Sequence, residues 1–260
     1  MSTTEPGIPL RHHGIARELG IEIIDGAWAV GHCRTLEEIQ SGFNVSRTVA
    51  REVSRQLEAM GLVRTRRRLG LVAQPISEWT ALDPTLIDWR LHSSQREDQI
   101  YSLTQLRLAV EPAAAESAAR FATIHTRASL LPLAFEMRRT GEAGELFEFL
   151  KYDIEFHATL LKNCGNELFA SLSGLVAVVL EGRTGQGLMP LQPKPEALDG
   201  HEAVAEAVFR GDPAGARAAM EGILQEVREA FWEAEEARIA RAASPRVEKI
   251  PGDTPLRARG

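Results

Sequence analysis

Three side chains in the second half of the sequence have the types and the spacing of metal ligands. Asp153 and His157 lie four residues apart in a segment with helical apolar spacing, so both are expected on its inward face. His201 lies on the apolar face of a later segment, in line with Val204 and Val208. Each would be costly to bury alone, so a metal ion, a bound ligand or a dense hydrogen-bond network must satisfy it. We therefore predict that these three potential ligands converge from two helices.

Other polar side chains in the same half of the chain could hold an organic acid. Arg107 is in line with Leu103 and Ala114 on an apolar helix face, and Arg183 continues the apolar face of another segment. A guanidinium offers a planar fork that matches a carboxylate. We therefore expect a helical cavity that binds a small carboxylate effector, whose oxygens could complete the shell of a cation. The candidate effector contacts are Arg107, Arg183 and Asn166.

A second group of arginines lies near the start of the chain and could bind nucleic acid. The whole chain of 260 residues has a net charge of −6, which by itself argues against DNA binding. Between residues 34 and 68, however, eight arginines stand against four glutamates, a local excess of about +4. Such donors suit base edges and phosphates. The candidates are Ser46, Arg47, Thr48 and Arg51 in the first turn of a predicted helix, with Arg55, Arg66, Arg67 and Arg68 for phosphates or the minor groove.

Capping signals define the helices that would present these arginines. Thr35 and Glu38 have the spacing of a capping box, which starts a short helix. Gly42 is expected to form the turn after that helix. Ser46 then caps a longer helix, which stops at Gly61.

The segments on either side of these two helices complete a winged helix-turn-helix. Residues 12–27 repeat apolar side chains at helical spacing and predict a preceding helix. Residues 62–75 alternate loosely and include a glycine, as in a two-stranded hairpin with arginines at its tip or flank. We therefore predict a winged helix-turn-helix DNA-binding domain over residues 1–75.

The remainder of the chain is predicted to be almost entirely helical. Residues 76–100 include Pro84 and a polar stretch and form the predicted connector, with a short helix expected around residues 86–91. The proline-containing residues 237–260 are predicted to be disordered. Residues 101–236 form the predicted sensing and dimerisation domain. The fold class is thus mainly α, an N-terminal winged helix-turn-helix plus a C-terminal antiparallel all-helical bundle. The expected helices are 101–121, 127–140, 144–163, 166–183, 199–211 and 213–236.

The arginine-bearing helix also resembles a known family. The segment NVSRTVAREVSRQLEAMGLV, residues 44–63, is similar to the recognition helix of the GntR family of bacterial repressors, with its VSR-x-x-x-RE-x-x-x-x-L-x-x-x-GL pattern. The resemblance implies that Arg47, Thr48 and Arg51 contact an operator and that Ser46 caps the helix.

The same resemblance bears on the wing and on the preceding helix. It implies that a wing residue near Arg68 or Gly70 reaches a groove of the DNA. Members often have a DNA-contacting arginine early in the preceding helix, whereas here Glu37 stands at that place and Arg34 lies just upstream. The operator sequence that this chain prefers is expected to differ accordingly.

The second half resembles the FCD effector domain of the FadR-type GntR subfamily. The segments LRLAVEPAAAESAA, DIEFHATLLKNCGN and HEAVAEAVFRGDPAGARAAM carry this similarity, over most of residues 101–230. In that family an Asp and three His commonly hold a divalent metal near the effector, which implies that role for Asp153, His157 and His201. The fourth family position is Ile223 here. Zinc with three protein ligands and an open position is one outcome, with nickel, manganese or an empty site as alternatives.

Together these features predict a ligand-responsive transcription regulator, a repressor rather than an activator, that acts as a cytoplasmic homodimer. The stretch LDPTLIDWRL, residues 82–91, resembles FadR-type regulators of sugar-acid catabolism, which favours gluconate or galactonate as effector. No apolar run approaches the roughly 18 to 20 residues that span a bilayer, so no membrane partner is expected. Two alternatives remain open: a metal-dependent enzyme acting on a small organic acid, and an architectural DNA-binding protein with no effector.

Overall fold

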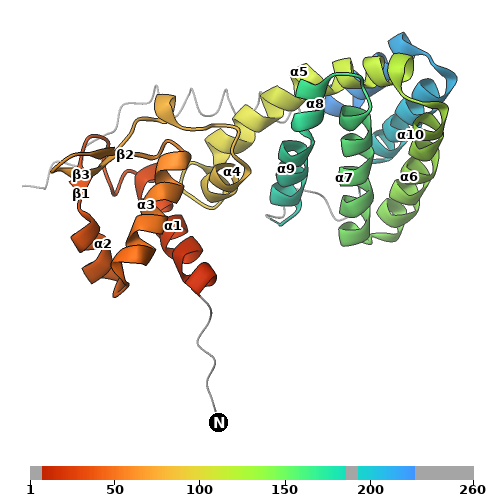
Figure 1. The fold of residues 1–260 in the computed structure, drawn as a ribbon. Helices are drawn as coiled ribbons and strands as arrows, with labels where there is room; N and C mark the ends of the chain where they lie inside the picture. Colours follow the sequence, from red (N-terminus) through yellow and green to blue (C-terminus); the bar gives the residue numbers. More distant parts are fainter. Residues whose placement is uncertain (1–7, 186–192, 226–260) are drawn as a thin grey trace, which may run out of the picture.

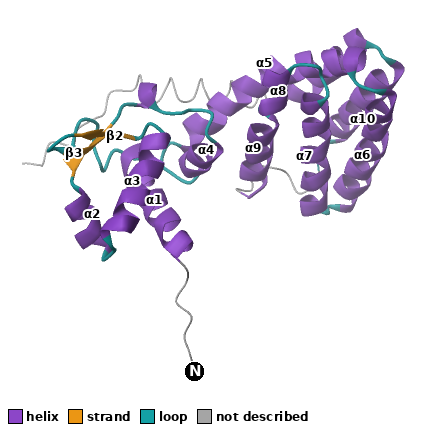
Figure 2. Ribbon diagram, in the orientation of Figure 1, coloured by secondary structure: helices purple, strands orange, loops and turns teal. Residues whose placement is uncertain are grey.

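The computed structural model describes residues 8–185 and 193–225. A small N-terminal body and a bundle of longer helices lie at opposite ends, with α4 (Pro84–Leu91) and the start of α5 (Arg96–Phe121) between them (Figure 1). Helices dominate both parts, and the described strands form one three-stranded sheet (Figure 2). These features confirm the predicted mainly α fold class. No helix among the described residues is long and apolar enough to cross a membrane.

The N-terminal body packs three helices against the small sheet. Their buried apolar side chains share one core with Leu71 and Ala73 of the sheet. The strand order is β1-β3-β2 and both pairings are antiparallel. Helix, helix, helix and hairpin therefore follow in the predicted order. The elements are α1 (Ile8–Ile24), β1 (Cys33–Arg34), α2 (Leu36–Phe43), α3 (Arg47–Ala59), β2 (Val63–Arg66) and β3 (Gly70–Ala73).

The predicted helix caps are present, but the turn between α2 and α3 lies elsewhere than expected. The Thr35 hydroxyl accepts from the Glu38 amide at 3.1 Å, and the Thr35 amide donates to the Glu38 carboxylate at 2.6 Å. Ser46 accepts from the Val49 amide. Gly42, however, lies inside α2, and Asn44 makes the turn with a φ of 50°. Asparagine tolerates this left-handed conformation better than other side chains, so Gly42 is not needed for it.

Strand β1 was not predicted from the sequence, and it closes the sheet beside the wing hairpin. Its two residues pair with β3, Cys33 opposite Val72 and Arg34 opposite Leu71. Two residues are too few to give an alternating pattern. At the start of β3, Gly70 has a φ of +100°, and a Cβ there would lie 2.5 Å from the Arg34 carbonyl oxygen.

Helix α4 joins the two bodies by packing into both. Asp83 caps it by accepting from the Thr85 and Leu86 amides at 2.8 and 2.9 Å. Leu86 and Trp89 belong to the N-terminal core. Ile87 and Leu91, on the other side of the helix, belong to a second cluster with residues of α5 and α9 (Ser173–Gly185). The predicted connector therefore includes a buried helix that touches both cores.

The second body is a bundle whose helices follow the predictions with shifted ends. α5 begins at Arg96, before the expected 101, and the expected helix 166–183 is divided by a turn at Leu172. One apolar core runs through the bundle. The predicted tail lies outside the described residues. The remaining helices are α6 (Ile124–Ala143), α7 (Leu146–Lys162), α8 (Glu167–Ser171), α10 (Pro195–Arg210) and a last helix described over 213–225.

We expect the substitution Gly70→Ala to destabilise the N-terminal body while Gly42→Ala does not. Alanine at residue 70 would be destabilised by roughly 1–2 kcal/mol in the left-handed conformation. Its Cβ would in addition overlap the Arg34 carbonyl oxygen. Gly42 is helical with nothing within 4 Å of a built Cβ, so alanine there gains about 1 kcal/mol of helix propensity. Urea unfolding of the full chain measures both free energies. Equal stability of the two variants would contradict this account of the wing.

Candidate metal centre and nucleic-acid interface

The three predicted metal ligands come together inside the helical bundle. α7 supplies Asp153 and His157 one turn apart, and α10 supplies His201 from the other side. All three are at most 4% exposed, and one donor atom from each lies within 4.8 Å of the others. Phe156 packs edge-on against both imidazoles. The site is thus formed by two helices far apart in the sequence and is walled by apolar side chains.

The spacing of the three donor atoms fits a tetrahedral metal ion. His157 Nε2 is 3.2 Å from Asp153 Oδ1, His201 Nε2 is 3.5 Å from the same oxygen, and the two Nε2 atoms are 3.4 Å apart. Zinc bonds of about 2.0–2.1 Å at the tetrahedral angle separate neighbouring ligand atoms by about 3.3 Å. One carboxylate and two imidazoles are also a donor set that zinc accepts. The residues present therefore fit such a metal.

Contacts at the Nδ1 atom of each imidazole orient its Nε2 atom toward the Asp153 carboxylate. His201 Nδ1 lies 2.6 Å from the Ala197 carbonyl oxygen, to which it donates. His157 Nδ1 lies 3.0 Å from the Glu111 carboxylate, although the N–H direction does not meet the oxygen well enough for a hydrogen bond. Asp153 Oδ1 is buried and receives no well-directed hydrogen bond from any described residue. Two imidazole nitrogens and one unsatisfied carboxylate oxygen thus face one another, an arrangement that a cation would stabilise.

A buried ion pair on α5 adjoins this centre and was not predicted from the sequence. Arg107 donates to both Glu111 oxygens, from Nε at 2.6 Å and from Nη2 at 3.2 Å. Both side chains are at most 4% exposed. Their spacing of four residues on one helix was the available signal for the pair. The approach of Glu111 to His157 depends on α5 packing against α7, which no local pattern encodes.

The surroundings of these groups shift each pKa toward the charged form, which leaves ionised carboxylates that favour positive charge in the cluster. Burial raises the pKa of Glu111, but Arg107 and His157 outweigh burial and bring the pKa down to about 2. Burial lowers the pKa of His157, but Glu111 and Asp153 outweigh it and raise the pKa to about 9. The pKa of Asp153 falls below its usual range, because the two histidines outweigh its burial. Without a metal, a proton on His157 meets this demand, so metal binding would release it.

Of the three predicted effector contacts, two have partners within the protein and the third lies outside the described side chains. Arg107 is paired with Glu111. Asn166 caps α8 by accepting from the Leu168 amide at 2.9 Å. The Arg183 side chain lies outside the described part of the chain. Ile223, at the position where the resemblance implied a fourth ligand, packs against Gly200 of α10, where a built Cβ would lie 2.6 Å from Ile223 Cγ1.

The predicted DNA contacts form an exposed surface on α3 and the wing. On α3, Arg47 and Arg51 form no ion pair with any described residue. Arg55 pairs with Glu52 of the same helix at 3.2 Å. Thr48 is exposed beside them and Ser46 caps their helix. Arg66, Arg67 and Arg68 are exposed around the tip of the hairpin, where Arg68 has a φ of 68°.

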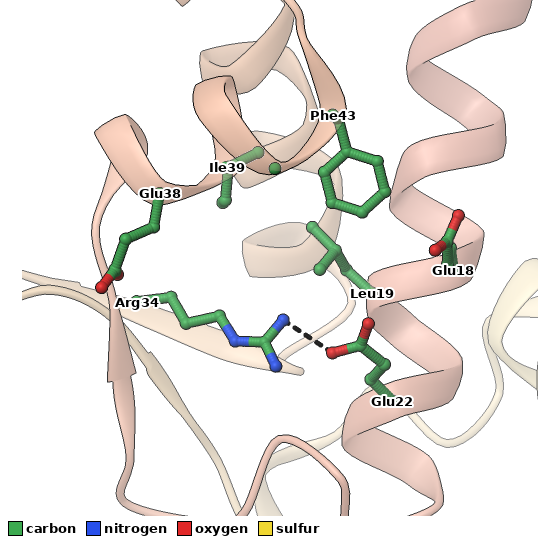
Figure 3. A pocket seen from close by; sticks show the side chains of 8 residues that line it. Glu18, Leu19, Glu22, Arg34, Glu38, Ile39 and Phe43 are labelled. Carbon is green, nitrogen blue, oxygen red and sulfur yellow. Dashed lines mark ion pairs between the residues drawn. The ribbon is translucent and has the colours of Figure 1, made fainter.

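Two further predicted DNA contacts have structural partners instead. Arg34 pairs with Glu22 of α1 at 2.6 Å, and its guanidinium lies 4.6 Å from the centre of the Trp28 ring. Figure 3 shows it turned toward α1, in a pocket that Glu18 and Glu38 also line. Gly70 is needed for the close approach to β1 described above. The acidic lining of this pocket is unfavourable for a phosphate.

Comparisons with known proteins agree with this division of the chain. The family model "Bacterial regulatory proteins, gntR family" matches residues 12–72, and the FCD domain model matches residues 102–226. The galactonate operon transcriptional repressor of Escherichia coli K12 is 30% identical over 199 residues, covering 75% of this chain and 85% of that protein. The HTH-type transcriptional regulator YieP of the same organism is 27% identical over 212 residues, covering 81% and 91%.

Among solved structures, the Listeria monocytogenes protein Lar has a similar fold. It superposes with a TM-score of 0.55 at 15% identity, covering 89% of this chain and 99% of Lar. The family and these relatives are transcription regulators, not enzymes, so the metal-dependent enzyme that the sequence left open is set aside. With a winged helix that presents exposed arginines and a helical domain that matches FCD, the chain belongs to the GntR family of bacterial transcription regulators.

Proposed function

We propose that the chain is a repressor whose helical domain binds a divalent metal together with a small carboxylate, and whose winged helix then changes its affinity for an operator. Residues 1–75 are the DNA-binding part, and residues 101–236 the sensing and dimerisation part. The observation that carries the proposal is the convergence of Asp153, His157 and His201 in the interior of the FCD domain. In an architectural DNA binder without an effector, the unsatisfied Asp153 carboxylate oxygen would cost free energy of folding and nothing would offset that cost.

The DNA-binding half of the proposal is supported by the exposed arginines of α3 and the wing. Arg47 and Arg51 lie in the first turns of the helix that follows the turn of the helix-turn-helix, where recognition helices contact base edges. The hairpin places Arg66, Arg67 and Arg68 beside it, where they would bind phosphates or enter the minor groove. Arg34 is not part of this surface in our proposal, because Glu22 and Trp28 hold it.

The charge of the buried cluster sets the charge of the effector. Arg107 and Glu111 neutralise each other, and Asp153 contributes one negative charge. With two neutral histidines, a divalent ion would leave the site with one net positive charge. A buried net charge is costly, and a single carboxylate would neutralise it. A monocarboxylate that binds the open metal position is therefore favoured over a dicarboxylate.

We favour a sugar acid such as gluconate or galactonate as this monocarboxylate. The relative from Escherichia coli is named as the repressor of the galactonate operon, and the inward polar groups suit a compact polar ligand. We place the regulator in the bacterial cytoplasm as a homodimer, so that two winged helices meet the two half-sites of an operator. Zinc is the favoured metal because the donor spacing is tetrahedral, with nickel and manganese as the alternatives.

Packing offers a route from the metal centre to the winged helix. α7, which provides Asp153 and His157, packs against α9, and α9 packs against α4. On α9, Gly182 leaves room for Leu91 of α4, since a Cβ there would lie 3.1 Å from Leu91 Cδ1. On α1, Gly20 leaves room for the Trp89 ring of the same helix. A shift of α7 on ligand binding would therefore move α4 against the DNA-binding body.

The DNA interface predicts that Arg47→Ala and Arg51→Ala bind operator more weakly than the wild type. Loss of one bidentate arginine contact costs about 1–3 kcal/mol, which corresponds to roughly 5- to 150-fold in affinity. Fluorescence anisotropy with the promoter DNA adjoining the gene gives the dissociation constants. Arg210→Ala, an exposed arginine of α10, is the matched control and should bind like wild type. Unchanged binding by the α3 variants would remove these residues from the interface.

The metal centre predicts that zinc stabilises the wild-type protein and that Asp153→Asn loses this effect. At free zinc about 100-fold above its dissociation constant, binding adds about 2.7 kcal/mol, a rise in Tm of roughly 5–10 °C. The control is Glu155→Gln, an exposed carboxylate on the same helix, which should keep the full shift. Differential scanning calorimetry of the metal-free protein, with and without added zinc, measures the rise in Tm. Equal shifts in all three proteins would place the zinc elsewhere.

The effector site predicts that gluconate or galactonate releases the protein from operator DNA only when metal is present. The acid binds the open metal position, so a chelator should abolish the response while leaving DNA binding itself intact. Anisotropy titrations with the two acids, each with and without chelator, measure the response. Neutral galactose is the control for the carboxylate. Release by galactose, or release by the acids after full metal removal, would exclude the proposed mode of binding.

A further inference from the structure

We propose that Glu111 is a positioning residue of the metal centre. It orients His157 and strengthens it as a ligand, and Arg107 serves as the counter-ion of Glu111 rather than as a contact to the effector. This inference rests on the metal site of the proposed function, because Glu111 acts through His157. It assigns a role to two buried charges that the three metal ligands leave unexplained.

The first step is the geometry of the His157 ring, which lies between two carboxylates. On one side Glu111 Oε2 is 3.0 Å from Nδ1, and on the other Asp153 Oδ1 is 3.2 Å from Nε2. The side chains of His157 and Glu111 are each only 2% exposed, so water cannot replace this contact. A carboxylate beside Nδ1 favours the tautomer with its proton there. The Nε2 lone pair then faces Asp153 and His201, as a metal ligand requires.

The second step is the difference between the two histidines. His201 is held through Nδ1 by a backbone carbonyl, that of Ala197. His157 has instead a full negative charge beside Nδ1. A carboxylate partner raises the basicity of an imidazole ligand more than a carbonyl does, and outer partners of this kind typically contribute 10- to 100-fold to metal affinity. Glu111 therefore compensates in part for a centre with only three protein ligands.

The third step is the role of Arg107, whose donors already have a partner. Its Nε and Nη2 both bind Glu111, at 2.6 and 3.2 Å, and the side chain is 4% exposed. An effector carboxylate at this guanidinium would have to displace Glu111. The two donors of the Arg107 guanidinium instead fix the Glu111 carboxylate in one orientation, with Oε2 toward His157. Arg107 also offsets the charge of a second carboxylate next to Asp153.

The test compares zinc and cobalt binding by the wild type and Glu111→Gln. The amide keeps the shape of the side chain and removes its charge. We expect the zinc dissociation constant, measured by competition with a chromophoric chelator, to rise about 10- to 100-fold. The d–d absorption of the cobalt(II) form at saturating metal should also change, which a purely structural role would not cause. Glu116→Gln, a partly exposed carboxylate on the same helix that pairs with Arg120, is the matched control and should bind like the wild type.

Glu111→Gln leaves the Arg107 charge buried without its partner, which could unfold the domain. A second variant therefore controls for misfolding. Arg107→Met/Glu111→Gln removes both charges and should show the same weaker zinc binding while circular dichroism confirms its fold. Wild-type affinity and an unchanged cobalt spectrum in both variants would overturn the role of Glu111 and leave the metal site standing. Failure of the wild type itself to bind zinc or cobalt would overturn the metal site of the proposed function, and this inference with it.

Discussion

The helical domain depends on the mutual compensation of charges within its apolar core. Arg107, Glu111, Asp153, His157 and His201 are each at most 4% exposed, and a single ionised group at such depth would be neutralised or would unfold the domain. Their pairing removes most of this cost but leaves one carboxylate oxygen unsatisfied. A bound cation would satisfy this oxygen, whereas a fully paired core would gain nothing from one.

The location of this centre makes it suitable for control of the winged helix. The three candidate ligands come from α7 and α10, so a metal held by them would tie together two helices that are otherwise held by apolar packing. α4 contacts both bodies through opposite sides of one short helix, with Leu86 and Trp89 on one side and Ile87 and Leu91 on the other. Packed interfaces of this kind move as units, so the proposed ligand-driven shift at the centre would reach the winged helix through α4.

The DNA-binding body shows why a local charge excess is only a first indication of an interface. Arginines at the start of α3 and at the tip of the wing are exposed. Arg34, in the same basic stretch, is instead held by Glu22 and the Trp28 ring, because strand β1 places it beside α1. A sequence pattern gives the charge of each residue, whereas the partner of that charge depends on which distant element folds against it.

The sequence alone determined the mainly α fold class, the order of the winged helix elements, the caps at Thr35 and Ser46, and the burial of Asp153, His157 and His201. These features follow from short-range periodicity and from side chain to backbone contacts within a few residues, which local sequence encodes. Only the tertiary structure decided the added strand β1, the packing of α4 into both cores, and the partner of His157. Glu111 could not be assigned from its own helix, because its contact requires α5 and α7 to pack in one register, and that register is set by the whole core.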